Sequence, residues 1–351
     1  MQQVIKASQH REWRNQLAAF ARVDVCHMPE YHEAYSLRYG GAEALMWVYR
    51  NNNEILCYPF LLTPVILKGD DGKALVSEFN DISGIYGYSG PLTNSDDKAF
   101  LAGAWQAFDQ WALEHRVVSE FIRFSTYVDN KSWAHPDTSV EYNRPVAIAW
   151  LPGDADTFMA QLNSKTRNMI RKALKSDLVV REVRVGEALA EFRALYQQTM
   201  GRNQATDFFM YDDAYYDRLL GLPAGELVLF AVYQQNEMVA AAMGLVHEKM
   251  AFYHLGASTL EASRLGAGNL ALFSMASALI DRGVECFSVG GGRTTADDDP
   301  LFRFKKSNAT SVDEFYIGKR VIDREAYDSI VKSWETMNDT ELTSGNLQFY
   351  R

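Results

Sequence analysis

Two stretches of the chain alternate between apolar runs and short polar turns in a way that predicts β-hairpins. Residues 45–67 read LMWVYRNNNEILCYPFLLTPVIL, and residues 227–246 read LVLFAVYQQNEMVAAAMGLV. In each, two β-rich runs flank an Asn- or Gln-containing turn, as in a hairpin. The two align closely, with one residue fewer in the second turn: Val48-Tyr49 matches Val232-Tyr233, and Asn53-Glu54 matches Asn236-Glu237.

The same order of elements follows each predicted hairpin. Residues 99–125 predict a helix and then a strand at 120–124, and residues 269–289 predict a helix and then a strand at 285–289. The helices place apolar residues on one face at a period of about 3.6. These residues are Trp105, Phe108, Ala112 and Leu113 in the first copy, and Leu272, Met275, Leu279 and Ile280 in the second. We therefore predict a duplicated unit of the α/β (α+β) class, with mixed twisted sheets flanked by helices.

Breaks in the pattern predict the domain boundaries. Pro152 and Gly153 interrupt any regular element, and an aspartate after them could cap the next helix. We predict an N-terminal domain at 1–150, a catalytic domain at 151–322 and a polar helical appendage at 323–351.

Composition narrows the class of protein. The 351 residues are 47% apolar with a formal net charge of −10, which argues for large cores and against a general nucleic-acid coat or a DNA partner. Three scattered cysteines form no metal-binding spacing, so we expect no metal. No apolar run reaches the roughly 18 residues that span a bilayer, and no signal pattern precedes the first polar helix. We expect a cytoplasmic protein with at most peripheral membrane contact.

One predicted helix is strongly basic. Residues 157–176 carry Lys165, Arg167, Arg171, Lys172 and Lys175 with almost no acid, and three of these cations recur every four residues. A solvated face and a phosphate-recognition face explain this equally well. A single-sign cluster in an acidic chain favours a bound anion.

Two glycine-rich segments offer ligand contacts. FNDISGIYGYSGPL (79–92) places Tyr86 and Tyr88 beside glycines that permit close approach, which we interpret as a cleft-lining loop rather than a plain connection. SRLGAGNLA (263–271) precedes an apolar helix, where free N–H groups make an anion cradle. Its match to a dinucleotide fingerprint is weak, because the strand ends too early and no acid follows the next strand. An acyltransferase pyrophosphate loop and a ligand-free helix start remain as alternatives.

The ordered set of motifs resembles the FemAB-like branch of the GNAT superfamily of N-acyltransferases, whose members carry two GNAT-like domains in tandem. The segments that carry the resemblance span most of the chain: SKTRNMIRKALKS (164–176), LYQQTMGRN (195–203), YYDRL (215–219), YHLGAS (253–258), GNLALF (268–273), FSVGGG (287–292), FRFKK (302–306) and DISGIYGYSGPL (81–92).

The resemblance implies roles for several residues. Lys305 would stabilise the tetrahedral oxyanion, with Lys306 as the alternate, and Arg202 would point into the same cleft. The acyl donor would contact Arg264, Gly266, Gly268 and Asn269, and the acceptor would contact Lys165, Arg167, Tyr86 and Tyr88. The general base is not obvious: His254, Asp207 and Asp81 are candidates, each more typical of a structural residue.

Three functions remain open. The first is an N-acyltransferase that uses acyl-CoA as a co-substrate, with no tightly bound cofactor, and acts on an amine of a cell-envelope glycan or of a nucleotide- or lipid-linked sugar precursor. The second is an aminoacyl-tRNA-dependent transferase that acts on a peptidoglycan precursor. The third is a non-catalytic glycan-binding scaffold. The acidic balance and the glycine loop favour the first.

Overall fold

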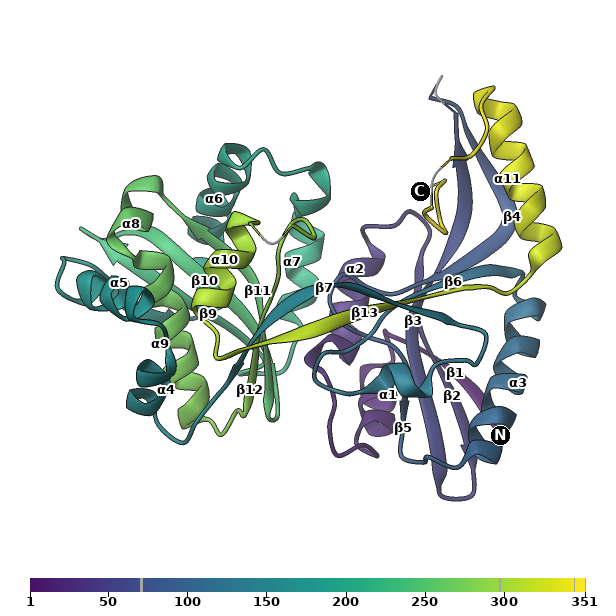
Figure 1. Cartoon of the computed structure of the whole chain (residues 1–351), viewed down its shortest axis with the longest axis horizontal. Helices are drawn as coiled ribbons and strands as arrows, with labels where there is room; N and C mark the ends of the chain where they lie inside the picture. The colour runs from purple at the N-terminus through teal and green to yellow at the C-terminus, as the bar shows by residue number, and fades with distance from the viewer. Residues whose placement is uncertain (70–71, 297, 344, 351) are drawn as a thin grey trace. The chain divides into compact units, whose positions relative to one another are not determined.

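The computed structural model describes residues 1–69, 72–296, 298–343 and 345–350. The chain forms two compact units, the first made of Met1–Tyr142 with Tyr316–Arg351 and the second of Asn143–Phe315. The polypeptide therefore passes between the units twice, within the strands β7 (Ser139–Trp150) and β13 (Ser311–Val321) (Figure 1).

The first unit contains a mixed sheet in the order β1-β2-β3-β4-β6-β13, and the short strand β5 pairs with β3. Strands β2 and β3 are an antiparallel hairpin, whereas β4 and β6 run parallel. The bounds are β1 (Gln2–Lys6), β2 (Glu43–Asn51), β3 (Glu54–Lys68), β4 (Ala74–Ser83), β5 (Leu92–Thr93) and β6 (Val117–Arg123).

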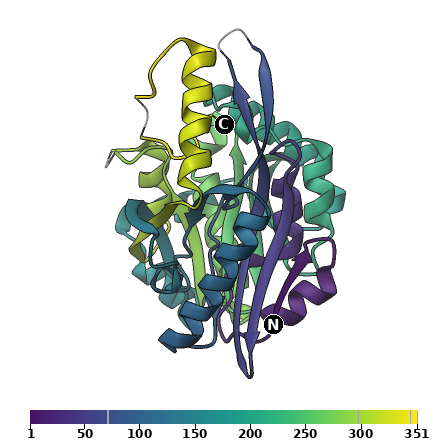
Figure 2. The same cartoon turned by 90° about the vertical axis from the view of Figure 1, so that its right-hand side faces the viewer.

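Helices cover this sheet: α1 (His10–Leu17), α2 (Pro29–Ser36), α3 (Lys98–Glu114) and α11 (Arg324–Asn338). The Asp97 carboxylate caps α3 by accepting from the N–H groups of Ala99 and Phe100. The helix then buries Trp105 and Phe108 against apolar side chains of β2, β3 and β6. Figure 2 shows α3 lying across the strands and α11 running beside the β3–β4 hairpin.

The C-terminal residues are an integral part of the first unit rather than the separate appendage predicted at 323–351. Helix α11 packs Ala326 and Ile330 against Val65, Leu67 and Val118 of the sheet. Beyond it, the Tyr350 hydroxyl donates to the buried Asp81 carboxylate over 2.8 Å. The sequence prediction missed this contact because polar residues on the exposed face of α11 outnumber the apolar residues that face the sheet.

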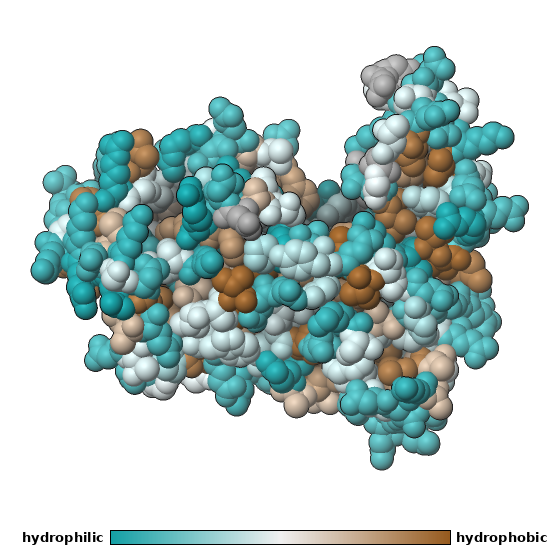
Figure 3. All heavy atoms as spheres, in the orientation of Figure 1, coloured by the Kyte–Doolittle hydropathy of each residue, from teal (hydrophilic) through white to brown (hydrophobic). Residues whose placement is uncertain are grey.

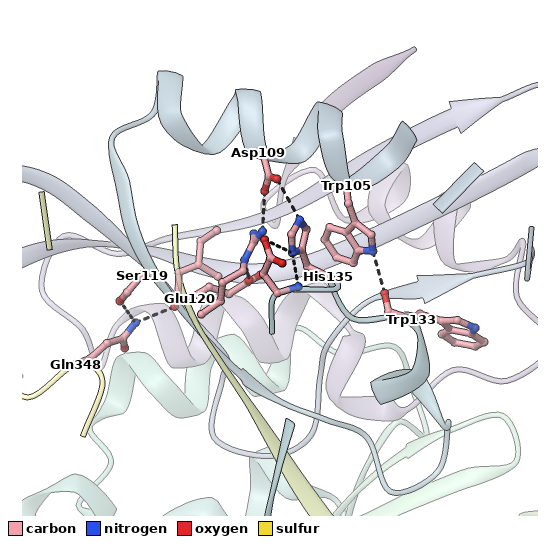
Figure 4. A network of polar contacts seen from close by, with 10 residues as sticks. Trp105, Asp109, Ser119, Glu120, Trp133, His135 and Gln348 are labelled. Atoms are coloured by element: carbon pink, nitrogen blue, oxygen red, sulfur yellow. Dashed lines mark hydrogen bonds and ion pairs between the residues drawn. The ribbon is translucent and has the colours of Figure 1, made fainter. Parts of the chain in front are cut away.

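A buried ion-pair network explains why the end of β13 belongs to the first unit. Arg320 donates to Glu120 of β6 over 2.8 Å and to Asp109 of α3 over 2.7 Å, and His135 Nε2 lies 3.1 Å from Asp109 (Figure 4). Arg320 and Glu120 are buried, so removing Arg320 would leave the Glu120 carboxylate without its ion-pair partner in the core. The boundaries therefore fall near residues 142 and 315, not at 150 and 322.

The second unit contains a sheet in the order β7-β12-β11-β10-β9-β8. The strands are β8 (Val179–Val183), β9 (Leu227–Gln234), β10 (Glu237–His247), β11 (Met250–Ser258) and β12 (Cys286–Gly291). The helices are α4 (Ala155–Gln161), α5 (Ser164–Leu174), α6 (Val185–Arg202), α7 (Asp213–Leu220), α8 (Leu260–Leu265), α9 (Ala267–Asp281) and α10 (Pro300–Ser307). Helix α9 supplies Leu270, Leu272, Met275 and Leu279 to a core shared with Phe158 of α4 and Ile170 of α5.

The predicted duplication is confirmed. Each unit consists of a hairpin followed by a strand, a helix and another strand. The two strands on either side of the helix are parallel neighbours, β4 and β6 in the first unit and β11 and β12 in the second. The two units differ in the segment that joins the third of these strands to the following long helix. The first has the tyrosine–glycine loop and β5, whereas the second has α8 and a turn at Gly266. Among the described residues, no helix has the length and apolar character that crossing a membrane requires.

Candidate active site

The parallel strands β11 and β12 separate partway along their length. Their pairing runs from Met250 with Cys286 to Phe252 with Ser288 and stops there, although β11 continues to Ser258 and β12 to Gly291. Beyond this point β12 pairs with β7 on its other side, and a register shift at Ser288/Gly290 accompanies the change. Beyond Phe252 and Ser288 these two strands are not paired with each other, and we call this unpaired part of the sheet the opening.

Lys305 reaches this opening from α10. Its Nζ lies 5.7 Å from the centroid of the Tyr253 ring on β11. On β12, a Cβ added to Gly290 would lie 2.9 Å from Nζ, so the amino group lies against the Gly290 backbone. Burial lowers the pKa of Lys305 to about 8, and the Asp299 carboxylate offsets only part of this effect. A cation that loses its proton this readily suits oxyanion stabilisation or proton transfer.

Asp299 fixes the helix that carries Lys305. It is the N-cap of α10, and Oδ1 accepts from the N–H of Phe302 over 2.8 Å. Oδ2 accepts from the N–H groups of Arg293 and Thr294 and from the Thr294 hydroxyl. Burial alone would raise the pKa of Asp299, but these hydrogen bonds outweigh it and lower the pKa. An acidic run in the sequence predicts a solvated or acceptor-facing loop at 297–299, but Asp299 is buried, and Asp297 lies outside the described residues.

His254 and Tyr215 form a second polar pair beside Lys305. The Tyr215 hydroxyl and His254 Nε2 are 2.8 Å apart. Burial, together with the Lys305 charge, lowers the pKa of His254 to about 3, so its imidazole is neutral at physiological pH. Sequence reasoning placed His254 among candidate bases and missed Tyr215 and Tyr253. Only the period-2 pattern of β11, which puts Tyr253 on the face opposite His254, could have drawn attention to the tyrosine.

The predicted donor loop forms a sharp turn between α8 and α9. Gly266 has φ 89°, and an added Cβ would lie 2.6 Å from the carbonyl oxygen of Met169 in α5. The residue ends α8 and begins α9 with no side-chain cap. The N–H groups of the first turn of α9, at Ala267, Gly268 and Asn269, have no intrahelical acceptors and carry the positive end of the helix dipole. This turn can hold an anion.

The other predicted donor residues divide into two kinds. Arg264 is exposed on α8, and its carbonyl accepts from Lys172. The Asn269 side chain is buried and donates to Asn308 Oδ1 over 3.0 Å, so it fastens α9 to the end of α10. Asn269 therefore positions the turn, whereas the Arg264 side chain is exposed to solvent.

Arg202 holds the end of β11. Its Nη2 donates to the Ser258 carbonyl over 2.8 Å, and Thr199 Oγ1 bonds both the carbonyl and the N–H of Ser258. We had predicted that Arg202 points into the catalytic cleft. The structure shows a side chain occupied with backbone at the start of the donor loop, which is a positioning role.

The predicted acceptor residues do not all present free side chains. Lys165 is exposed at the start of α5, whereas Arg167 donates to the carbonyls of Ala160 and Leu162 and so closes the end of α4. In the first unit, Tyr88 is only 5% exposed, because its loop packs against the core. Tyr86 is half-buried, with the Arg123 guanidinium 5.4 Å from its ring. A sequence shows that tyrosines flank glycines but not which of them points inward.

Two other predictions can be compared with the structure. Asp81, one candidate base, is buried and accepts from the hydroxyls of Ser119 and Tyr350, so it is structural. Within the described residues, no cluster of His, Cys, Asp or Glu could hold a metal ion.

Comparison with known proteins identifies the second unit. Residues 164–306 match the family model for the acetyltransferase (GNAT) domain. The UDP-N-acetylmuramoylpentapeptide-lysine N(6)-alanyltransferase of Weissella viridescens is 22% identical over 185 residues, and that alignment spans 51% of this chain and 53% of the relative.

Solved structures extend the likeness to the whole chain. FemX superposes with a TM-score of 0.68 at 14% identity, covering 94% of this chain and 99% of that one. A tandem GNAT protein from the clavulanic acid biosynthesis pathway superposes with a TM-score of 0.50 at 9% identity, covering 92% and 99%. Residues 164–306 of the chain therefore match the GNAT domain family, and the whole chain has the fold of FemX and of a tandem GNAT protein.

Proposed function

We propose that the second unit transfers an acyl group from an activated donor to an amine of a cell-envelope precursor. The observation that carries this proposal is the Lys305 amino group, which lies between Tyr253 of β11 and Gly290 of β12 where the two strands separate. A carbonyl placed in that opening would meet a partly buried cation, whose charge acts more strongly than it would in bulk water.

In this mechanism the acceptor amine attacks the donor carbonyl directly. The Lys305 ammonium donates a hydrogen bond to the developing oxyanion, and collapse of the tetrahedral intermediate expels the donor's thiol or hydroxyl group. The attacking amine gives up a proton, and the neutral His254–Tyr215 pair lies beside Lys305 to relay it. The turn at Gly266 holds the donor phosphates at the first turn of α9.

Acyl-CoA is the donor that we favour. A pyrophosphate fits the anion cradle at Gly266 and Gly268, and Arg264 supplies a nearby cation. CoA is then a co-substrate that leaves with each turnover. The cell-envelope acceptor is supported by the Weissella viridescens relative, whose name specifies a lysine amine of a UDP-N-acetylmuramoyl pentapeptide.

An aminoacyl-tRNA donor is the second candidate, because that same relative is an alanyltransferase. Mass spectrometry of products distinguishes the two donors. The purified protein is incubated with UDP-linked amino sugars and UDP-linked pentapeptide, and with either acetyl-CoA and longer acyl-CoAs or alanyl- and seryl-tRNA. We expect a product one acyl group heavier with a CoA donor. A product formed only with charged tRNA selects the second candidate, and no product with any donor contradicts the proposal.

A further inference from the structure

A cationic surface lies on α5. Lys165, Arg171 and Lys172 of this helix, and its C-cap Lys175, are all exposed. At 3.6 residues per turn, they fall within an arc of about 120° around the helix axis. The opposite side of the helix, with Thr166, Ile170 and Ala173, is buried. We call these four residues the basic arc.

The basic arc continues onto α8. Lys172 Nζ donates to the carbonyl of Arg264 over 2.8 Å, which places the exposed Arg264 beside it. Figure 3 shows hydrophilic side chains gathered over α5 and α8, at the left of the view. Acidic side chains near in sequence do not neutralise them: Asp177 accepts from Gln234, and Glu261 is a single carboxylate on α8.

The cations of the basic arc are not used in ion pairs. Within the described part of the chain, none of the four forms one. Arginines elsewhere in the second unit do pair with acids, as Arg184 does with Glu187 and Arg282 with Glu182. Since the protein carries a net charge of −10, an unpaired single-sign surface is costly unless an anionic partner covers it.

Apolar side chains accompany these cations. Leu174 lies about 60° around the helix axis from Arg171, outside the basic arc, and is 57% exposed, and Leu260, on α8, is 46% exposed. Exposed aromatic side chains, on which nucleic-acid bases stack, do not occur among the described residues of α5 and α8. Lysines and arginines with interspersed leucines match an anionic bilayer interface, where the cations meet headgroup phosphates and the leucines enter the acyl boundary.

We propose that the basic arc, with Leu174 and Leu260, is a docking surface for an anionic lipid membrane. The surface would hold the enzyme at a bilayer without a spanning segment. The proposal concerns where the protein binds and does not depend on which donor or acceptor it uses.

Vesicle flotation tests this directly. The full chain is mixed with phosphatidylcholine vesicles or with equimolar phosphatidylcholine–phosphatidylglycerol vesicles. We expect binding only to the anionic vesicles, weakened by salt. The double variant Arg171→Glu/Lys175→Glu should bind at least about tenfold more weakly, since each basic residue near the surface contributes to the attraction. Leu174→Ser should also bind more weakly without a change in charge.

Controls separate this proposal from its alternatives. The variant Lys98→Glu/Lys332→Glu, which reverses two exposed cations of the first unit, should bind vesicles like the wild type. Melting curves confirm that each variant folds, and transfer between soluble substrates without vesicles should be unchanged in Arg171→Glu/Lys175→Glu. The proposal is overturned if the wild type binds neutral and anionic vesicles equally, or if Arg171→Glu/Lys175→Glu binds anionic vesicles as the wild type does. It is also overturned if fluorescence anisotropy shows that the wild type binds tRNA while flotation shows no binding to anionic vesicles.

Discussion

The charge of Lys305 changes within the pH range in which transferases are assayed. Its folded pKa of about 8 lies below the ordinary lysine value of 10.5, because burial penalises the ammonium form. The protonated form is therefore present below about pH 8 and is lost as the pH rises through that value.

This shift gives a pH-dependence prediction. If the ammonium stabilises the oxyanion, kcat/KM should fall as the pH rises through about 8. Lys305→Arg should retain a fraction of the activity and lose this falling limb, because arginine stays protonated. A pH–rate profile checks both. Activity that rises with pH to a plateau above 8 would assign Lys305 as a base instead.

Asp299 tunes Lys305 as well as capping its helix. We expect Asp299→Asn to cost about 1–3 kcal/mol of unfolding free energy, because an amide nitrogen cannot accept the bonds from Arg293 and Thr294. The variant should also move the falling limb of the pH profile to lower pH, because the carboxylate raises the pKa of Lys305. Asp298→Asn, at the exposed neighbouring position, is the matched control and should change neither property.

Single residues were predicted unevenly from sequence. Lys305 was identified because it lies in a motif with a fixed place after β12, and the structure puts its amino group at the strand opening. Arg167 and Tyr88 are a different case. Arg167 donates to backbone carbonyls and Tyr88 is buried in the core. The sequence around each residue would look the same if its side chain contacted a ligand instead.

The turn between α8 and α9 is the element that orients the donor cradle. Gly266 adopts a left-handed conformation and lies against the Met169 carbonyl, so a side chain there is both strained and blocked. Gly268, two residues on, is helical, and a Cβ there would contact only Phe304 at 3.4 Å. The two glycines therefore have separable roles.

This separation can be tested by thermal melts and donor titration. Gly266→Ala should destabilise the protein by at least about 1–3 kcal/mol because of its backbone conformation. Gly268→Ala should leave the melting temperature unchanged or slightly raised, because alanine favours helix. If a phosphate approaches the backbone closely, Gly268→Ala should still raise the KM for the donor. Equal stability of the two variants would contradict this account of the turn.

The long helices and the hairpins were predicted because their apolar residues recur at a constant period over many residues. The observed α3 and α9 occur where the apolar spacing placed them, although Leu113, which we assigned to the apolar face of α3, is 53% exposed. Both predicted hairpins are present. The helix α8 was not foreseen, since its six residues are too few to display a period. The separation of β11 from β12 was also missed, because strand pairing depends on partners far away in sequence.

At the scale of the whole molecule, the C-terminal segment closes the first unit. The Asp81 carboxylate is buried and accepts from Ser119 and Tyr350, and Gln348 donates to the Ile82 carbonyl. The contacts of Tyr350 and Gln348 join residues 269 and 266 positions apart, so no local pattern in the sequence could reveal them.

Tyr350→Phe should therefore destabilise the protein by about 1–3 kcal/mol, because a buried carboxylate loses a donor. Chemical denaturation would measure the loss. Tyr142→Phe, which removes the hydroxyl of a tyrosine that is 54% exposed in the same unit, should change stability by less than about 0.5 kcal/mol. Equal effects of the two substitutions would show that the C-terminal segment does not stabilise the fold.

The order of elements made the tandem architecture predictable, but the sequence did not indicate how the units share the chain. Because β7 and β13 each run through both units, a linear boundary could not describe the division. Both features to which we assign the proposed chemistry, the turn at Gly266 and Lys305, lie in the second unit.

The central claim is that the Lys305 amino group promotes acyl transfer at the strand opening. The most direct test compares kcat/KM of Lys305→Ala and Lys306→Ala with the wild type, using the donor and acceptor found by mass spectrometry. We expect Lys305→Ala to lose about 100- to 1000-fold. Lys306→Ala, at an exposed position on the same helix, should remain within about threefold of the wild type. Near-wild-type activity of a folded Lys305→Ala variant, or an equal loss in both variants, would contradict the account.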